Sequence, residues 1–217
     1  MELTRPDNWK FKFLSGTIHI LLRCLYKIEI HGLNHVPERG PAILVANHQS
    51  YLDVPLVGYV LIQRKSLHGS YWVIGKTTYA SPYLHWFYAC CPVVVINGTV
   101  KKSEWALHQG YFVTIFPEGF HAWNRYKAKR KGIQEPELKI GTSAAILALK
   151  TGFPVIPMGL RGTEKALPPF AWIPKRGKLE VRVGEPFHFH KPEPEEVTDE
   201  MIAEKTKLIM QHIDALR

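Results

Sequence analysis

Short, uninterrupted apolar runs recur along the chain, and segments with helical periodicity separate them. Such a run suits a strand with both faces buried, because a strand with one face in water alternates apolar and polar residues. The clearest runs span residues 42–46, 71–74, 92–96, 111–116 and 155–160. Helical patterns lie between them, at residues 54–63, 82–90, 101–109 and 141–151. This alternation predicts an α/β fold, a single domain with a largely parallel central sheet flanked by helices.

Two further segments alternate apolar and polar residues, which is typical of strands with one solvated face. They span residues 27–31 and 179–183, and we expect the second to lie at an edge of the sheet. Residues 197–216 have the pattern of a surface helix that is rich in charge. A chain of 217 residues is a suitable length for one folded domain with short additions at its ends.

The segment from residue 9 to residue 28 has the pattern of a helix with a narrow polar stripe. Its polar residues recur at every fourth position, at Ser15, His19, Arg23 and Lys27. The longest stretch without a formal charge, residues 13–22, is ten residues long, whereas a helix needs about 20 apolar residues to cross a bilayer. We expect an amphipathic helix in the membrane interface, with Trp9, Lys10 and Lys12 at headgroup level. The alternative is a core helix that packs on the sheet.

Charge is unevenly distributed along the chain. Residues 1–191 hold 25 Lys and Arg against 12 Asp and Glu, whereas residues 192–217 hold three against seven. A basic body attracts polyanions, which include nucleic acids, anionic lipid headgroups and phosphorylated co-substrates. We divide the chain into an N-terminal helix (1–27), a folded domain (28–191) and an acidic C-terminal helix (192–217). The odd number of cysteines and the lack of a secretory-signal pattern predict a cytoplasmic location.

A histidine and an aspartate follow the first of the long apolar runs, in the segment Asn47-His48-Gln49-Ser50-Tyr51-Leu52-Asp53. The imidazole of His48 can accept a proton near neutral pH, and a carboxylate on its other nitrogen would stabilise the imidazolium that forms. Five residues turn about 140° on an ideal helix, so these two side chains meet only across a strand-to-helix turn. The alternative is that Ser50 or Asp53 merely caps the helix beginning near Val54.

A glutamate follows a second apolar run, in the segment Phe116-Pro117-Glu118-Gly119. Proline ends a strand, and glycine permits a sharp turn. Because sites in parallel sheets form beyond the carboxyl ends of the strands, Glu118 would lie at the same rim as His48. The alternative is a solvated glutamate in a surface turn.

Together the two segments resemble the signatures of glycerolipid acyltransferases of the PlsC-like, 1-acylglycerol-3-phosphate acyltransferase type. Residues 47–53 are similar to the family's His-x4-Asp motif with its preceding asparagine, and residues 116–119 to its second signature, in the expected order. Further similarities lie at residues 30–33, Pro37, Gly40-Pro41, 139–141 and 155–157. The resemblance covers roughly residues 28–185.

The resemblance implies transfer of a fatty acyl group from acyl-CoA or acyl-carrier protein to the hydroxyl of a lysophospholipid. The first expectation for this acceptor is 1-acylglycerol-3-phosphate, which gives phosphatidic acid. His48 would be the general base, Asp53 would orient it, Glu118 would hold the polar part of the acceptor, and Gly119 would shape the turn. No metal and no cofactor are implied. The expected partners are the acceptor, the acyl donor and an anionic membrane surface, without nucleic acid, at the cytoplasmic face as a peripheral or monotopic protein.

Two departures from the family pattern leave the acceptor's headgroup open. Residues 120–122 are Phe-His-Ala where the family usually has Thr-Arg-Ser, and Asn97-Gly98 stands where it usually has an arginine. The family associates both arginines with the acceptor's phosphate, so a lysolipid with a zwitterionic or amino-acid headgroup is the alternative acceptor. The remaining candidate binding residues are Asn47, Ser50, Lys101, Arg125 and Lys139. Residues 120–140 hold a basic cluster, which is either a solvated loop or a site for the phosphates of CoA or anionic lipid.

Two other classes of protein remain as alternatives. A metallohydrolase would use His48, Asp53, Glu118 and His121 as ligands, although the sequence has no His-Glu-x-x-His and no Cys-x-x-Cys. A non-enzymatic adaptor for membranes or nucleic acids would use the basic surface. Its aromatic residues near lysines could stack on bases: Trp105, Tyr111, Trp123 and Tyr126.

Overall fold

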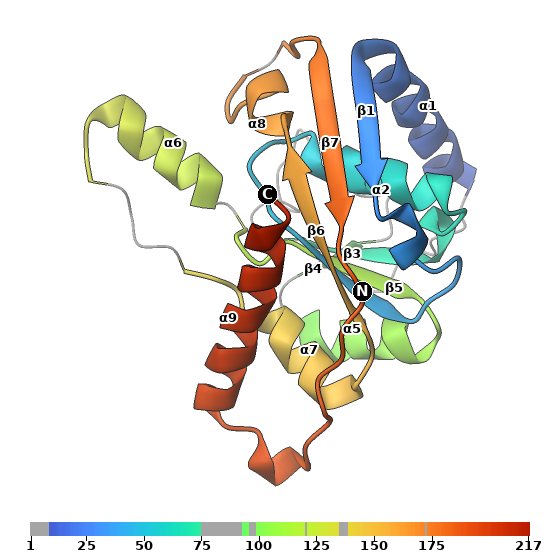
Figure 1. Ribbon diagram of the computed structural model, residues 1–217, viewed down its shortest axis with the longest axis vertical. Coiled ribbons are helices and arrows are strands. Elements are labelled where there is room, and N and C mark those ends of the chain that lie inside the picture. Colours follow the sequence, from blue (N-terminus) through green and yellow to red (C-terminus); the bar gives the residue numbers. More distant parts are fainter. Residues whose placement is uncertain (1–8, 75–92, 96–98, 120, 135–138, 172) are drawn as a thin grey trace.

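The apolar runs form one seven-stranded sheet in the order β1-β7-β6-β2-β5-β3-β4 (Figure 1). The structure is a computed structural model that describes residues 9–74, 93–95, 99–119, 121–134, 139–171 and 173–217. The strands are β1 (Tyr26–His31), β2 (Ala42–Ala46), β3 (Ser70–Ile74), β4 (Val93–Val95), β5 (Phe112–Ile115), β6 (Val155–Arg161) and β7 (Gly177–Val183). The α-helices are α1 (Trp9–Leu25), α2 (Asp53–Gln63), α5 (Thr99–His108), α6 (His121–Lys131), α7 (Ser143–Thr151), α8 (Thr163–Ala166) and α9 (Asp199–Ala215). Short 3₁₀ turns lie at Leu33–His35, Leu67–Gly69 and Pro194–Glu196.

All neighbouring strands are parallel except β6 and β7, so the prediction of a largely parallel sheet is confirmed. The prediction that residues 179–183 form an edge strand is wrong, because β7 lies between β1 and β6. The alternation in β7 instead reflects one buried face and one partly exposed face. An interior strand shows this pattern where no helix covers one of its faces. The helix predicted at residues 82–90 lies outside the described residues.

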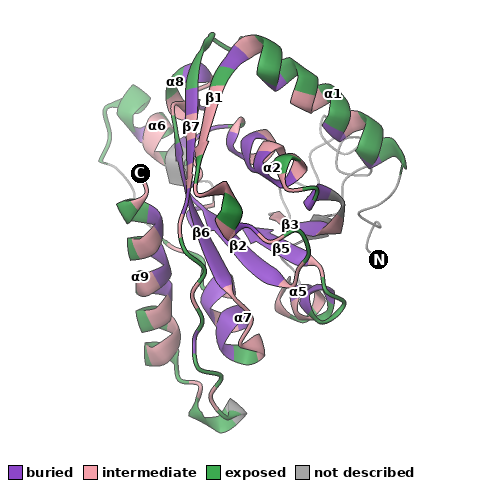
Figure 2. Cartoon of the chain, turned by 45° about the vertical axis from the view of Figure 1, so that its right-hand side comes forward, coloured by how far each residue is buried: buried purple, intermediate pink, exposed green. Residues whose placement is uncertain are grey.

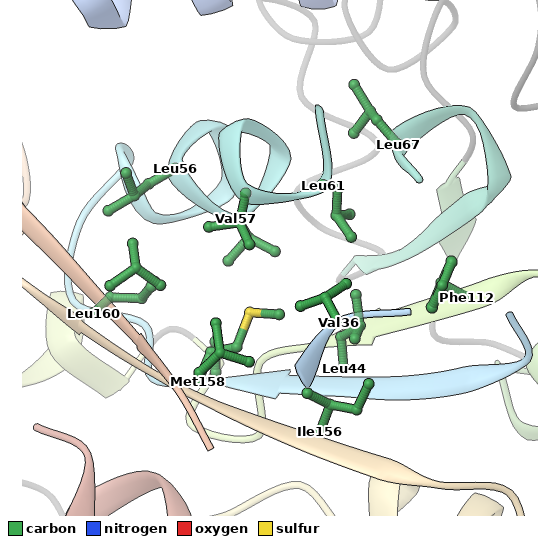
Figure 3. Packing of buried hydrophobic residues seen from close by; sticks show 14 of the residues in the cluster. Val36, Leu44, Leu56, Val57, Leu61, Leu67, Phe112, Ile156, Met158 and Leu160 are labelled. Atoms are coloured by element: carbon green, nitrogen blue, oxygen red, sulfur yellow. The ribbon is translucent and has the colours of Figure 1, made fainter. Parts of the chain in front are cut away.

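Helices cover both faces of the sheet and produce two apolar layers. In β2, the side chains of Ala42, Leu44 and Ala46 belong to the layer with α1 and α2, and those of Ile43 and Val45 to the layer with α5, α7 and α9. All five residues are buried, which explains the uninterrupted apolar run (Figure 2). Figure 3 shows α2 lying over the strands of the first layer, with Leu56, Val57 and Leu61 pointing toward them.

Helix α1 has apolar side chains on two faces. Phe11 and Leu22 are buried in the first layer, and His19 stacks on Tyr59 of α2 with ring centroids 4.6 Å apart. The outward side chains are large, apolar and 53–74% exposed: Trp9, Phe13, Ile20 and Leu21. The helix ends at Leu25, three residues earlier than expected, because Tyr26 already pairs with β7. Within the described part of the chain, no helix has both the length and the apolarity that crossing a bilayer requires.

The basic segment after Glu118 is a helix, α6, so the prediction of a loop there is wrong for residues 121–131. Lysine, arginine and alanine favour helices, and Trp123 and Ala128 give this one a narrow buried face. In Figure 1, α6 projects away from the sheet, with its first turn nearest to the rest of the molecule.

Candidate active site

The two motif segments lie side by side at one edge of the sheet. Strands β2 and β5 are parallel neighbours, and Val45 pairs with Ile115. His48 and Glu118 each follow this pair by three residues, so the common rim expected for them is observed. The backbone N–H of His48 donates a hydrogen bond to Oε2 of Glu118 at 2.9 Å, which joins the two segments directly.

Asp53 turns back from the first residue of α2 toward His48. Its Oδ2 lies 3.0 Å from Nδ1 of His48 and accepts the backbone N–H groups of Gln49 at 2.6 Å and Ser50 at 2.7 Å. The carboxylate is fully buried. The cap position of α2 is Leu52, and no side chain caps it there, so the alternative of a simple helix cap is not what the structure contains.

This arrangement fixes the protonation pattern of the imidazole. The Asp53 oxygen beside the ring already accepts two backbone N–H groups, and a carboxylate offers acceptors only. Nδ1 of His48 therefore carries the hydrogen, and Nε2 carries the lone pair that a general base needs.

Aromatic side chains surround the ring of His48. The ring centroids of Phe116 and Trp123 lie 4.6 and 4.7 Å from that of His48, and Tyr51 lies 5.1 Å from Trp123. The His48 side chain is only 13% exposed. These walls keep bulk water from the base and hold the ring in one orientation.

Glu118 is buried behind His48, and only 2% of its surface is exposed. One carboxylate oxygen accepts the His48 N–H, and the other forms an ion pair with the guanidinium of Arg217. Gly119 has a left-handed φ of 53° and donates its N–H to the carbonyl of Phe116 at 3.0 Å, which closes the tight turn expected there. Each oxygen of the Glu118 carboxylate thus already has one partner within the protein.

Arg217 is a site residue that the motifs do not reveal. It follows α9 and reaches a glutamate 99 positions earlier in the chain, while its Nη1 lies 3.1 Å from Oδ1 of Asp214. Burial lowers the pKa of Arg217, and the negative charge of Asp53 acts in the opposite direction. An arginine stays protonated at neutral pH in either case, so the site contains a fixed positive charge beside Glu118.

Asn47 and Ser50 are fully buried and bind backbone groups. The Asn47 side chain accepts from the N–H of Leu160 at 2.7 Å and donates to its carbonyl at 3.0 Å, which ties the end of β2 to β6. The Ser50 hydroxyl donates to the carbonyl of Leu167 at 2.6 Å and accepts from the N–H of Leu52 at 3.1 Å. Both side chains therefore hold the loop that carries His48.

The predicted basic residues are spread more widely. Arg125 is half-buried on α6, two positions after Trp123. Lys139 is exposed, near the point where the N–H of Gly141 donates to the carbonyl of Pro117 at 2.8 Å. Lys101 lies on α5, which follows the edge strand β4, three places along the sheet from β2. Among the described residues, no three His, Cys, Asp or Glu side chains gather in a way that could hold a metal ion.

Comparisons with known proteins agree with this geometry. Residues 27–161 match the sequence profile of the family described as Acyltransferase. The chain is 34% identical over 177 residues to the chloroplastic 1-acyl-sn-glycerol-3-phosphate acyltransferase LPAT1 of Arabidopsis thaliana, a region that is 76% of this chain and 45% of that protein. It is 33% identical over 177 residues to the chloroplastic enzyme BAT2 of the same name in Brassica napus, again 76% of this chain and 46% of the relative.

A solved structure has the same fold. The 1-acyl-sn-glycerophosphate acyltransferase PlsC from Thermotoga maritima superposes with a TM-score of 0.63 at 20% sequence identity, over 94% of this chain and 80% of that one. The similarity extends beyond the matched profile, since it takes in almost the whole chain.

Proposed function

Since the chain belongs to the acyltransferase family, we propose that it transfers a fatty acyl group from acyl-CoA or acyl-carrier protein to the free hydroxyl of 1-acylglycerol-3-phosphate, giving phosphatidic acid. The support for this acceptor is the similarity to the two plant relatives, which are called 1-acyl-sn-glycerol-3-phosphate acyltransferases and are 34% and 33% identical to the chain. The chain spans less than half of the length of either relative.

The observation that carries the proposal is the 3.0 Å contact between Nδ1 of His48 and Oδ2 of Asp53, beside the turn that contains Glu118. In the proposed reaction, Nε2 of His48 removes the proton from the acceptor's hydroxyl, and Asp53 stabilises the imidazolium. The hydroxyl oxygen then attacks the thioester carbonyl. The resulting tetrahedral intermediate expels the thiolate, which takes the proton from His48, so an ester forms, a thioester breaks and the enzyme is regenerated.

Direct attack by the acceptor suits this site better than a covalent acyl-enzyme. The motif's serine, Ser50, donates its hydroxyl hydrogen to the carbonyl of Leu167 at 2.6 Å, so this hydrogen is not available to the imidazole. In the proposed reaction His48 therefore acts on the substrate's hydroxyl rather than on a side chain of its own loop.

The proposal also specifies the headgroup of the acceptor. Arg217 places a guanidinium near the base, although Phe120, His121 and Ala122 replace the Thr-Arg-Ser of the family pattern. A planar guanidinium suits a phosphate monoester. We therefore rank lysophosphatidate first and a lysolipid with another headgroup second.

The proposed site of action is a membrane surface, to which the protein attaches as a peripheral or monotopic protein through the outer face of α1. Four large apolar side chains are exposed on this helix, whose inner face is occupied by α2. We propose the cytoplasmic side, where free thiols such as that of Cys24 are kept reduced.

A panel assay tests the activity and the acceptor together. Labelled acyl-CoA or acyl-carrier protein is offered with lysophosphatidate, with lysolipids of zwitterionic and amino-acid headgroups, and with monoacylglycerol. We expect the highest kcat/KM with lysophosphatidate, and we expect His48→Ala to lower turnover by about 10² to 10⁴, the usual contribution of a general base, without loss of donor binding.

His190→Ala is the matched control, because His190 is exposed and belongs to neither motif. If His48→Ala and His190→Ala turned over equally well, His48 would not be the base. If another lysolipid gave a higher kcat/KM than lysophosphatidate, that lysolipid would be the acceptor. If no pair of donor and acceptor gave an ester product, the proposed activity would be rejected.

A further inference from the structure

Helix α6 concentrates positive charge on a projecting part of the molecule. Its eleven residues, HAWNRYKAKRK, include five Lys and Arg and no Asp or Glu. Four of these bases are exposed and Arg125 is half-buried. Within the part of the chain that the structure describes, none of the five forms an ion pair. The helix therefore has five charges to offer to an anionic partner.

The first turn of the same helix covers the catalytic base. Trp123 is only 4% exposed and packs against the ring of His48, with centroids 4.7 Å apart. Tyr126, one turn later, lies 6.0 Å from Phe170 of the loop after α8. The helix that carries the basic residues thus begins beside the catalytic base.

Apolar side chains are exposed around this helix. Tyr51 is 45%, Phe170 is 42% and Ile133 is 59% exposed. Basic residues with aromatic and aliphatic neighbours are typical of surfaces that lie at the boundary of lipid headgroups and acyl chains.

The distribution of the charges favours a surface over a single small ligand. Successive residues are about 100° apart on a helix, so the five bases surround α6 instead of converging on one point. One phosphate group can contact only two or three of them. A layer of lipid phosphates can attract all five. A helix is about 10–12 Å wide, and the screening length at physiological salt is about 8 Å, so even the bases on the far side of α6 feel part of the attraction.

From these features we infer that α6 docks on an anionic phospholipid surface, with its bases against the lipid phosphates and Tyr51 and Phe170 in the headgroup region. Along the long axis of the molecule, α1 and α6 lie toward the same end, on opposite sides of the sheet's upper edge (Figures 1 and 2). The inference deepens the proposed function, on which it rests, because it brings the helix that packs on His48 to the bilayer that supplies the lysolipid.

The first test measures binding of the full chain to sedimented vesicles of phosphatidylcholine, alone or mixed with phosphatidylglycerol. The variant Lys127→Gln, Lys129→Gln, Lys131→Gln removes three exposed charges and keeps a good helix former at each position. We expect its partition coefficient on the anionic vesicles to fall about a hundredfold, or about fivefold for each charge, and to stay unchanged on neutral vesicles. High salt should abolish the difference.

The matched control removes the same net charge elsewhere. Lys150, Lys191 and Lys207 are exposed and lie on or near α7 and α9, away from α6. The triple Gln variant at these positions should bind anionic vesicles almost as well as the wild type. Equal losses in the two variants would overturn the inference, because overall charge would then account for the binding.

A second measurement separates lipid from CoA phosphates and separates this inference from the proposed activity. With short-chain, monomeric acceptor and donor, the α6 variant should match the wild type, whereas transfer to vesicle-bound acceptor should fall. A raised KM for the soluble acyl-CoA would overturn the lipid assignment in favour of donor binding. If neither the wild type nor the α6 variant transferred an acyl group, but the α6 variant still bound anionic vesicles more weakly, the proposed activity would be rejected and the docking of α6 would be supported.

Discussion

Asp53 organises the site through one oxygen atom. Its Oδ2 accepts the ring N–H of His48 and the N–H groups of Gln49 and Ser50, at 2.6 to 3.0 Å. A carboxylate oxygen accepts and never donates, so this one atom can serve all three donors. Asp53 thus shapes the loop and orients the base at the same time.

The variant Asp53→Asn should separate these roles from a helix cap. An amide oxygen can take the place of Oδ2, but it carries no charge, so it stabilises the imidazolium less, and the NH2 group would take the buried place of Oδ1, which has no hydrogen-bond partner. We expect turnover to fall by about 10² to 10⁴ and unfolding free energy to fall by about 1–3 kcal/mol. Steady-state kinetics and urea denaturation measure the two effects. Near-normal turnover with a loss of about 1 kcal/mol would instead identify a cap.

The motif residues could be predicted because their partners are close in sequence or lie on adjacent parallel strands. His48 and Asp53 are five residues apart, and Glu118 follows the strand next to β2. Arg217 has no such signal, since its contact with Glu118 depends on where the whole of α9 packs. The burial of Asn47 and Ser50 was likewise hidden, because a polar residue in a loop gives no sign that its partners are backbone groups of β6 and of the α8 region.

At the scale of elements, α1 illustrates why one pattern supported two hypotheses. Its narrow polar stripe leaves apolar residues around most of the helix, and the sequence does not say which of them meet the protein. The structure buries Phe11 and Leu22 on the domain and leaves Phe13 and Ile20 outside. Deleting the whole helix would therefore disturb the core as well as the outer face.

Point substitutions on the outer face give a cleaner test of the membrane role. Phe13 and Ile20 are 74% and 63% exposed, so Phe13→Ser with Ile20→Ser should change unfolding free energy by no more than about 0.5 kcal/mol per site. We expect the variant to sediment less with neutral and anionic vesicles alike, because it loses apolar contact and not charge. Phe11→Ala, on the buried face, should instead cost about 3–5 kcal/mol of stability. Unchanged sedimentation of the outer-face variant would contradict an interfacial role for α1.

Strand β7 and helix α6 were predicted wrongly for different physical reasons. Alternation in β7 reports exposure of a face, whereas an edge position depends on hydrogen bonding to β1, which is distant in sequence. The sequence pattern of α6 did not predict a helix. Lys, Arg and Ala favour helices, but repulsion among the bases and the lack of an apolar stripe both argue against one. Burial of Trp123 and Ala128 supplies what the local pattern lacks.

On the scale of the whole molecule, α9 brings Arg217 back to the turn that contains Glu118. Helix α9 packs on the second layer, with Ile209 and Ile213 buried. Its last turn then crosses β6 at Gly159, where an added Cβ would lie 2.5 Å from the backbone carbonyl of Leu216. The missing side chain at position 159 thus lets Arg217 reach Glu118.

Gly159→Ala should therefore damage the site from a distance. Because the obstructed atoms are backbone, the end of α9 must move, and Arg217 leaves Glu118. A hydrogen bond to a charged group contributes about 1.5–3 kcal/mol, so we expect kcat/KM to fall by about 10- to 100-fold, with a similar loss for Arg217→Gln. Kinetics of both single variants and of the double variant measure the effects, and Gly177→Ala is the control, because a Cβ there meets open space.

The double variant decides whether the two positions act through one contact. If Gly159 matters because it admits Arg217, the second substitution adds little to the first, and the losses are non-additive by about 0.5–3 kcal/mol. Arg217→Lys keeps the positive charge. In the chain that retains Gly159, it should have a higher rate than Arg217→Gln only if the end of α9 still reaches Glu118. Fully additive losses would mean that the crossing at β6 and the ion pair at Glu118 are independent, and α9 would then stabilise the fold without serving the base.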